Sequence, residues 1–342
     1  MSLAEELARG GAIFYVQRNY EIVRQVIAKS LIEKGVVLEP LSSAVKKGWV
    51  DKLLWTVLPA REIEPKGAFV YIPPYVKVQA PVSFCFTVDK GSQSVHNVLV
   101  IGEGSEVTVT SVCSSAGDGK EHKGYTEVFL GKRAKLDYVM VHSWAKDTRV
   151  EAELGVIVDS EAVMNELYVS LRSPYELRGN ARFILRKKAS LSASTIYLAT
   201  LGRALLETGV TIESENSSAE VTSRVVAAKG SIVRQPILLE AKAPNTKGHV
   251  ECKGLQLSHD SVIETIPSLR SAHGGAQLTH EAAIGKISEE ELAYLTSKGF
   301  TEDEAVTLLV RGFLELGIKG LPESLKPQIT SILDLLARAA TG

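Results

Sequence analysis

The chain has 342 residues, of which 45% are hydrophobic and 23% charged, a composition that is ordinary for a soluble protein with one large domain or two smaller ones. Its 39 basic and 40 acidic residues give a formal net charge of −1, so the overall charge provides no reason to expect nucleic acid or an anionic membrane as a partner. No stretch approaches the roughly 18–20 consecutive apolar residues of a membrane-spanning helix.

Residues 1–66 are predicted to form a helical cap. The first residues, MSLAEELARGG, lack the basic and then apolar pattern of a secretion signal, so we expect a cytoplasmic protein. Asn19 is a candidate N-cap for a helix that would end at Gly35, and the apolar face of this helix would consist of Ile22, Val23, Val26, Ile27 and Leu31. A second, shorter amphipathic helix is indicated by Trp49, Leu53, Leu54 and Trp55.

Residues 67–285 are predicted to form a β-solenoid. This part is rich in Val, Thr, Ser and Ile, and its period-two alternation, as in residues 106–110 and 190–194, indicates short strands with one buried face. Similar units recur along the segment, and their apolar anchors are Val107, Leu136, Met164, Leu191, Val221 and Val250. The spacings between these anchors are 29, 28, 27, 30 and 29 residues, a nearly constant period that is typical of solenoids.

Residues 286–342 are predicted to be helical again. Two capping boxes, Ser288 with Glu291 and Thr301 with Glu304, mark two helix starts, and a third candidate helix follows Pro322. The apolar face of the second helix includes Leu308, Leu309 and Phe313. This face either covers the edge of the solenoid or receives a partner protein.

The chain contains three cysteines, Cys85, Cys113 and Cys252, too few and too far apart for a disulfide framework. The absence of a CxxC motif excludes a self-contained four-thiolate cluster site within one chain. The sequence also lacks the phosphate-binding pattern GxxxxGK[ST], so any energy from nucleotide hydrolysis would have to come from another subunit.

The candidate metal ligands are Cys252, His280 and Glu281. A thiolate, an imidazole and a carboxylate form a plausible shell for iron or zinc. Three ligands leave one coordination position open, which suits a site that builds or transfers a group. The alternative interpretation is a buried thiol with a capping glutamate beside a surface histidine.

The residues around these candidates resemble a known family. From Val250 to Phe313 the chain reads VECKGLQLSHDSVIETIPSLRSAHGGAQLTHEAAIGKISEEELAYLTSKGFTEDEAVTLLVRGF, which resembles the C-terminal signature of the SufB/SufD family of iron–sulfur cluster assembly proteins. Two further blocks are similar to that family, GAFVYIPP at residues 67–74 and the segment between Gly104 and Trp144. The resemblance covers residues from about 60 to 315. It implies a right-handed parallel β-helix with C-terminal helices that bind a SufC-type ABC ATPase.

The resemblance also implies roles for single residues. Cys252 matches the cysteine that SufB-type chains use in cluster assembly, and His280-Glu281 follows the SufB pattern, whereas SufD-type chains tend to lack the glutamate. Cys113 falls where SufB-type chains accept sulfur from a donor protein. Two positions depart from the SufB pattern, because His142 replaces a glutamine and Thr87 an arginine, which leaves open how an internal path for sulfur would be built.

The main hypothesis is therefore a scaffold, not an enzyme, that forms a transient iron–sulfur cluster at a dimer interface. The dimer would be a homodimer or a heterodimer of the SufB/SufD type, and reduced flavin is one candidate electron source. Two alternatives are a structural β-helix subunit without cluster chemistry and a β-helix enzyme acting on polysaccharide. The enzyme is disfavoured, because aromatic residues make up only 6% and no paired carboxylates stand out.

Overall fold

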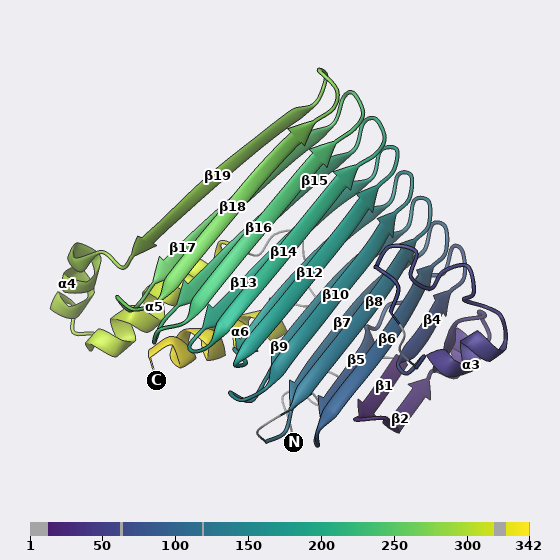
Figure 1. The fold of residues 1–342 in the computed structure, drawn as a ribbon, viewed down its shortest axis with the longest axis horizontal. Helices are drawn as coiled ribbons and strands as arrows, with labels where there is room; N and C mark the ends of the chain where they lie inside the picture. Colours follow the sequence, from purple (N-terminus) through teal and green to yellow (C-terminus); the bar gives the residue numbers. More distant parts are fainter. Residues whose placement is uncertain (1–12, 62–63, 118–119, 318–325, 342) are drawn as a thin grey trace.

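The structure is a computed structural model, which describes residues 13–61, 64–117, 120–317 and 326–341 and consists mainly of strands in two facing sheets (Figure 1). In spatial order, sheet A contains β19 (Gln277–Lys286), β17 (Lys247–Gln256), β15 (Ser218–Ala227), β13 (Ser190–Ala199), β11 (Val163–Arg172), β9 (Lys135–Ser143), β7 (Glu106–Ser115), β5 (Val82–Val88), β1 (Ile13–Arg18) and β2 (Glu21–Ile27). Sheet B contains β18 (Val262–Ser271), β16 (Ile232–Ala241), β14 (Arg203–Ile212), β12 (Glu176–Leu185), β10 (Arg149–Val158), β8 (Glu121–Leu130), β6 (Ser92–Ile101), β4 (Ala68–Ile72) and β3 (Val37–Pro40).

From β4 onward, successive strands alternate between the two sheets, and neighbouring strands of each sheet are parallel. Each turn of the chain therefore contributes one strand to each sheet, and the predicted parallel β-solenoid is confirmed. Alternate side chains of every strand point into the space between the sheets, where they form one long apolar core. The strand pairs stack with few breaks in register, so equivalent positions on successive turns form columns along the solenoid.

The register corrects the sequence-based period at one point. Four of the predicted anchors are direct Cα partners on successive strands of sheet A, namely Val107, Leu136, Met164 and Leu191. Leu191, however, pairs with Ala219, while Val221 lies one inward position further along its strand. The spacing from Leu191 to its true partner is therefore 28 residues. The sequence-based analysis chose Val221 instead of Ala219 because both positions face inward and valine is the more apolar residue.

The turns that lead into β7, β9, β11, β13, β15 and β17 share one backbone conformation. A residue with positive φ lies two positions before each of these strands, and it is Gly104 in the first turn and a residue other than glycine in the other five: Arg133, Glu161, Lys188, Asn216 and Asn245. The turns also stack on one another, because the backbone N–H of Arg133 donates to the carbonyl of Ser160 and that of Glu161 to the carbonyl of Lys187.

The prediction of an N-terminal helical cap is wrong for residues 13–27. This segment forms the antiparallel strands β1 and β2, and β1 pairs in parallel with β5, so it extends sheet A. Its β-branched residues favour a strand, and the edge of β5 offers unpaired backbone groups. Within the first 66 residues, the described helices are α2 (Lys29–Ile32) and α3 (Leu41–Lys46), and the segment containing Trp49 and Trp55 forms turns.

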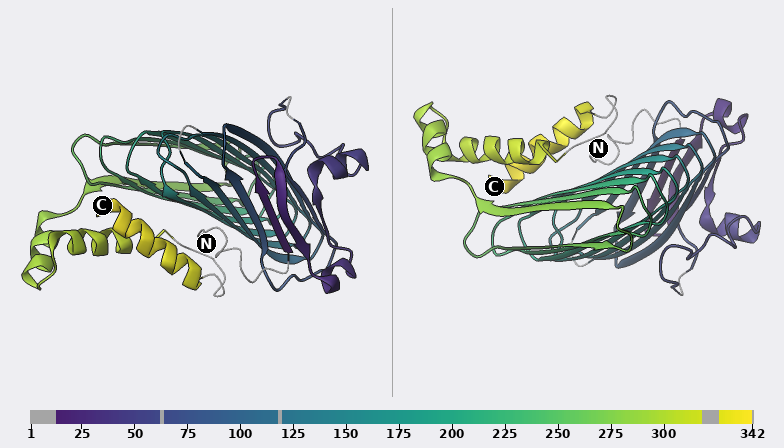
Figure 2. Two further views of the ribbon diagram at one scale, coloured as in Figure 1. Left: turned by 90° about the horizontal axis from the view of Figure 1, so that it is seen from below. Right: turned by 90° about the horizontal axis from the view of Figure 1, so that it is seen from above.

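The C-terminal residues are helical, as predicted, in α4 (Glu289–Ser297), α5 (Glu302–Glu315) and α6 (Lys326–Thr341). Figure 2 shows α5 and α6 along the outside of the solenoid, whereas α4 projects beyond its end. The two packed helices cover the outer face of sheet A, where they bury Val139, Leu167, Ile196 and Leu198 against Val310, Leu314, Ile332 and Leu336. None of the helices in the described parts of the chain combines the length and apolar character needed to cross a membrane.

Candidate functional site

Cys252 lies in β17, in the last turn but one of the solenoid, and its side chain points into the core. Its exposure is 1%, and its Cα partners are Ser223 on β15 and Ala282 on β19. Burial raises the pKa of the Cys252 thiol, although the Thr265 hydroxyl and the Arg224 guanidinium act in the opposite direction. The thiol is therefore protonated at neutral pH in this conformation, and a metal ion would have to displace its proton.

His280 shares a face of sheet A with Cys252. It is the Cα partner of Val250, a core residue on β17, and therefore lies one strand away from Cys252 and two residues out of register with it. His280 is nevertheless exposed, because β19 is the last strand of sheet A and no further turn within the described residues stacks on it.

Glu281 lies on the opposite face of β19. It is the Cα partner of Glu251, and its carboxylate forms an ion pair with Lys253 Nζ at 3.3 Å on the outside of the solenoid. Adjacent residues of a strand point to opposite faces, so His280 and Glu281 cannot both face Cys252 while β19 remains a regular strand. Among the residues that the structure describes, no three or more His, Cys, Asp or Glu side chains converge so that they could hold a metal ion. One chain thus brings Cys252 and His280 together and separates Glu281 from them.

No described part of the chain covers the last turn of the solenoid. It consists of β18 and β19, and its apolar side chains Val262, Ile266 and Ile284 are between 41% and 46% exposed. An unpaired terminal strand with exposed apolar residues is a template for pairing with another chain.

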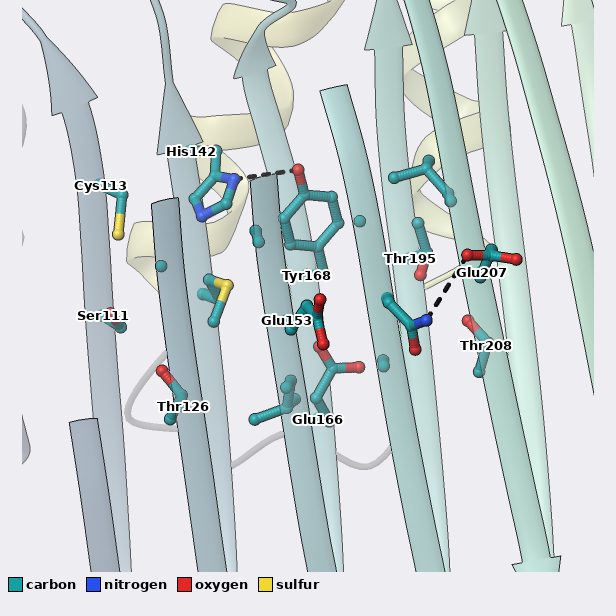
Figure 3. Close-up of a pocket in the computed structure, with 18 of the residues that line it drawn as sticks. Ser111, Cys113, Thr126, His142, Glu153, Glu166, Tyr168, Thr195, Glu207 and Thr208 are labelled. Atoms are coloured by element: carbon teal, nitrogen blue, oxygen red, sulfur yellow. Dashed lines mark hydrogen bonds between the residues drawn. The ribbon is translucent and has the colours of Figure 1, made fainter. Parts of the chain in front are cut away.

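Cys113 lies on β7 inside the solenoid and lines an internal cavity of about 80 Å³ (Figure 3). Its Cα partner on β9 is His142, whose Nδ1 lies 3.1 Å from the Tyr168 hydroxyl oxygen. Burial raises the pKa of Cys113 to about 12, and burial lowers the pKa of His142 to about 3. Both groups are neutral at pH 7, so this conformation does not show the accessible, activated thiolate that sulfur acceptance requires.

The same cavity contains a carboxyl group that the sequence analysis did not single out. Glu166 lies on β11 in the column of Tyr138 and Ala193, and it points into the core, where burial raises its pKa to about 8. The alternation along this strand could have predicted that Glu166 points inward, because Glu166 follows the inward-facing Met164 by two residues. The cavity exists because small residues occupy consecutive inward positions of sheet B, at Gly124, Ala152 and Gly179.

Two further residues are buried on opposite sides of sheet A. Trp144 lies in the core, with 1% exposure and its ring centre 4.8 Å from that of His122 and 5.2 Å from that of His142. Cys85 is buried on the outer side of the sheet, beneath the C-terminal helices.

The predicted docking residues differ in exposure. Leu308 is 44% exposed on α5, whereas Leu309 and Phe313 are half-buried. The fully buried face of α5 consists of Ala305, Val310 and Leu314. The helix therefore has one apolar face against the solenoid and presents Leu308 to solvent.

The fold and the site together define a parallel β-solenoid protein with a thiol and an imidazole at its open end. The chain matches the family model described as SUF system FeS cluster assembly, SufBD core domain, over residues 84–313. It is 34% identical over 319 residues to an iron-sulfur cluster assembly SufBD family protein of Archaeoglobus fulgidus, which covers 89% of this chain and 86% of that protein.

A protein of Methanothermobacter thermautotrophicus with the same description is 30% identical over 354 residues, covering 97% of this chain and 84% of that protein. A protein of Staphylococcus epidermidis with this description is 24% identical over 345 residues, covering 95% of this chain and 74% of that protein. The chain belongs to the SufB/SufD family, as its sequence signature indicated, and this membership assigns it a role in iron–sulfur cluster assembly.

Proposed function

We propose that this chain is a SufB-like scaffold subunit, not an enzyme, and that it builds a nascent iron–sulfur cluster at the open end of its solenoid. The observation that supports this proposal is the placement of Cys252 and His280 on one face of the last two strands of sheet A. The cluster is the product that the scaffold releases, so an exposed terminal turn suits the task better than a closed site would.

The ligand set of one chain is incomplete, which supports assembly between two chains. A second copy, or a SufD-type paralogue, would cover the exposed apolar residues of β18 and β19 and bring its own side chains toward Cys252 and His280. Glu281 lies on the outer face of β19. It would reach a cluster held by the opposing chain, or the cluster at its own Cys252 if β19 rearranges.

A SufC-type ATPase would dock on the C-terminal helices. The projecting helix α4 and the exposed Leu308 support this part of the proposal. Truncation after Gly285 would be a poor test, because it would uncover the apolar outer face of sheet A. Leu308→Glu leaves that face covered and should abolish capture of the ATPase subunit, while Glu315→Lys, an exposed change on the same helix, should not.

Cys113 would receive sulfur from a donor protein only when the solenoid opens locally, since the thiol lies inside the core. The cavity beside Cys113 extends along the interior to Val221, which pairs with Val250, two residues from Cys252. Reduced flavin is one candidate electron source for the assembly reaction.

Anaerobic reconstitution with ferrous iron and sulfide, followed by visible absorption, tests the scaffold function. The Cys252→Ser protein should lose most of the absorbance, because the only soft ligand near the open end is removed. The matched control is Cys85→Ser, which changes a thiol on the outer side of the sheet and should load normally. Full loading of the Cys252→Ser protein would remove Cys252 from the site, whereas a wild-type protein that forms no cluster would favour the structural, non-assembling alternative.

A further inference from the structure

A buried arginine lies between the C-terminal helices and the open end of the solenoid. Arg224 is on the outer face of β15, and its side chain is 3% exposed because α5 covers it. Its guanidinium carbon lies 5.8 Å from the centre of the Phe313 ring. Two residues after the end of α5, a Cβ on Gly317 would lie 2.6 Å from Arg224 Cγ, so only glycine fits there without displacing the arginine.

Arg224 begins a ladder of ion pairs that crosses three strands of sheet A. Its Nη2 lies 2.6 Å from Glu251 Oε1 on β17, and the same carboxylate oxygen lies 2.9 Å from Lys253 Nζ. Lys253 also contacts Glu281 on β19, at 3.3 Å. Glu251 and Lys253 flank Cys252 in the sequence, and Glu281 follows His280, so the ladder holds the backbone on both sides of the candidate ligands.

The burial of the first pair of the ladder, Arg224 with Glu251, indicates a positioning role for Arg224. The side chain of Glu251 is 11% exposed, and both Arg224 and Lys253 lie within ion-pair distance of its carboxylate. Apolar residues of similar size often stabilise a protein as well as a buried ion pair does, because the charges must be desolvated. An ion pair differs from apolar packing in fixing one direction and one distance between its partners.

We propose that Arg224 is a positioning residue. It couples the position of α5 on sheet A to the Cys252 end of the solenoid through the ion pairs of Glu251, Lys253 and Glu281. When α5 shifts, Arg224 becomes exposed to solvent and its ion pair with Glu251 is disturbed. The ion pair between Lys253 and Glu281, which holds the terminal strand β19 from the outer face, is then weakened. The ion pairs of the ladder do not depend on the proposed function. Only the identification of this end of the solenoid as the assembly site rests on it.

Two glycines of the same chain provide a matched test. Gly317→Ala pushes on Arg224, and Gly317 lacks a left-handed φ, so this contact is the main perturbation. Gly312 lies within α5, and a Cβ there meets nothing within 4 Å, so Gly312→Ala is the control. Hydrogen–deuterium exchange of the full chain should show amides of β17 and β19 exchanging about tenfold faster in Gly317→Ala than in wild type, with β7 and β9 unchanged. Gly312→Ala should match wild type, and equal effects of the two changes would overturn the proposal.

Charge at position 224 is tested separately. Arg224→Gln should increase exchange in β17 and β19 as Gly317→Ala does, and Arg224→Lys should restore part of the protection because it keeps the charge toward Glu251. Arg234→Gln is the control, since Arg234 is exposed on sheet B and pairs with Glu264 outside the ladder. If Arg224→Gln fails to fold, the double variant Glu281→Gln/Gly317→Ala is compared with the two single variants. If the ladder connects the two positions, the increase in β17 exchange in the double variant should differ from the sum of the two single increases. Additive effects would overturn the proposal.

Reconstitution with iron and sulfide links the ladder to assembly. Gly317→Ala should alter the visible circular dichroism of the reconstituted cluster, and Gly312→Ala should leave it as in wild type. If wild type itself forms no cluster, the proposed function fails, while the exchange experiment still decides whether Arg224 couples α5 to β17 and β19. If the spectrum of Gly317→Ala equals that of wild type, the ladder does not position the assembly site.

Discussion

At the scale of single residues, burial sets the charge state of the solenoid interior. Cys113, His142 and Glu166 line one cavity, and their pKa values of about 12, 3 and 8 make all three neutral near pH 7. A neutral interior can enclose polar groups without the large cost of burying charges. Chemistry at Cys113 therefore requires local opening or a new charged partner.

Glu166 should make the stability of the protein depend on pH. Burial raises its folded-state pKa from 4.5 to about 8, so between these values the folded state holds a proton that the unfolded state has released. The free energy of unfolding should therefore fall as the pH rises from about 4.5 to about 8. Glu166→Gln, which resembles the protonated acid, should change the stability by less than about 1 kcal/mol at pH 5 and should stabilise the protein by on the order of 4 kcal/mol at pH 8.5.

Urea denaturation of both proteins at the two pH values measures this difference. Glu213→Gln changes an exposed glutamate and should have little effect at either pH. Identical pH profiles for wild type and Glu166→Gln would contradict a buried, protonated Glu166.

Substitution of Glu281 should distinguish an effect on cluster assembly from an effect on protein stability. Its side chain is 58% exposed and its pair with Lys253 lies at the surface, so Glu281→Ala should change the free energy of unfolding by no more than about 0.5 kcal/mol. If Glu281 serves the cluster, the same change should lower the yield or the lifetime of the reconstituted cluster by about tenfold. Thermal melting and anaerobic reconstitution of one preparation measure both. Normal assembly by the alanine variant would remove Glu281 from the site.

At the scale of elements, the strands repeat a simple pattern while their turns carry local strain. Lys188 and Asn216 occupy equivalent turn positions, with φ of 58° and 61°. A side chain with a Cβ is disfavoured in this region, and asparagine tolerates it better than lysine does. The left-handed turn is thus specified by the stacked strands and not by its own residue type.

Glycine at these turns should stabilise the solenoid unequally. Lys188→Gly should raise the free energy of unfolding by about 1 kcal/mol, because the relief of strain exceeds the entropy that glycine adds to the unfolded chain. Asn216→Gly should gain less, since asparagine is already tolerated there. Calorimetric melting temperatures of the two variants give the comparison, and a larger gain at Asn216 would contradict this account of the turns.

The elements differ in how well their sequences predict them. Alternation and a period near 28 residues predict the solenoid strands, because each strand buries one face and stacks on its neighbour. The segment from Ile22 to Ile27 was predicted as a helix, since its apolar spacing also fits a helical face, and the decisive factor was the unpaired sheet edge far away in sequence. The same alternation, applied to Cys252, His280 and Glu281, would have placed Glu281 on the outer face. Burial of Cys113 and the Arg224 ladder depend on contacts between distant segments, which no local pattern contains.

At the scale of the whole molecule, the two ends of the solenoid are not equivalent. The N-terminal end finishes in the antiparallel strand β2, where Val23 is 53% exposed. The C-terminal end finishes in β19, where Ile284 is 41% exposed beside the turn that carries the candidate ligands. As far as the described residues go, β2 and β19 each have one unpaired edge that another chain could use, and the proposed function requires association at the C-terminal end.

Association through the C-terminal end predicts an asymmetric effect of two matched substitutions. Ile284→Glu places a charge in the interface and should weaken dimerisation by about 100-fold or more, because an apolar contact is lost and a carboxylate is desolvated. Val23→Glu introduces the same charge on the exposed strand at the other end and should leave dimerisation unchanged. Sedimentation of wild type and both variants over a range of concentrations measures the dissociation constants. A dimer that Val23→Glu disrupts and Ile284→Glu does not would place the interface at the N-terminal end, away from Cys252, and a scaffold that joins two chains around the cluster would then be wrong.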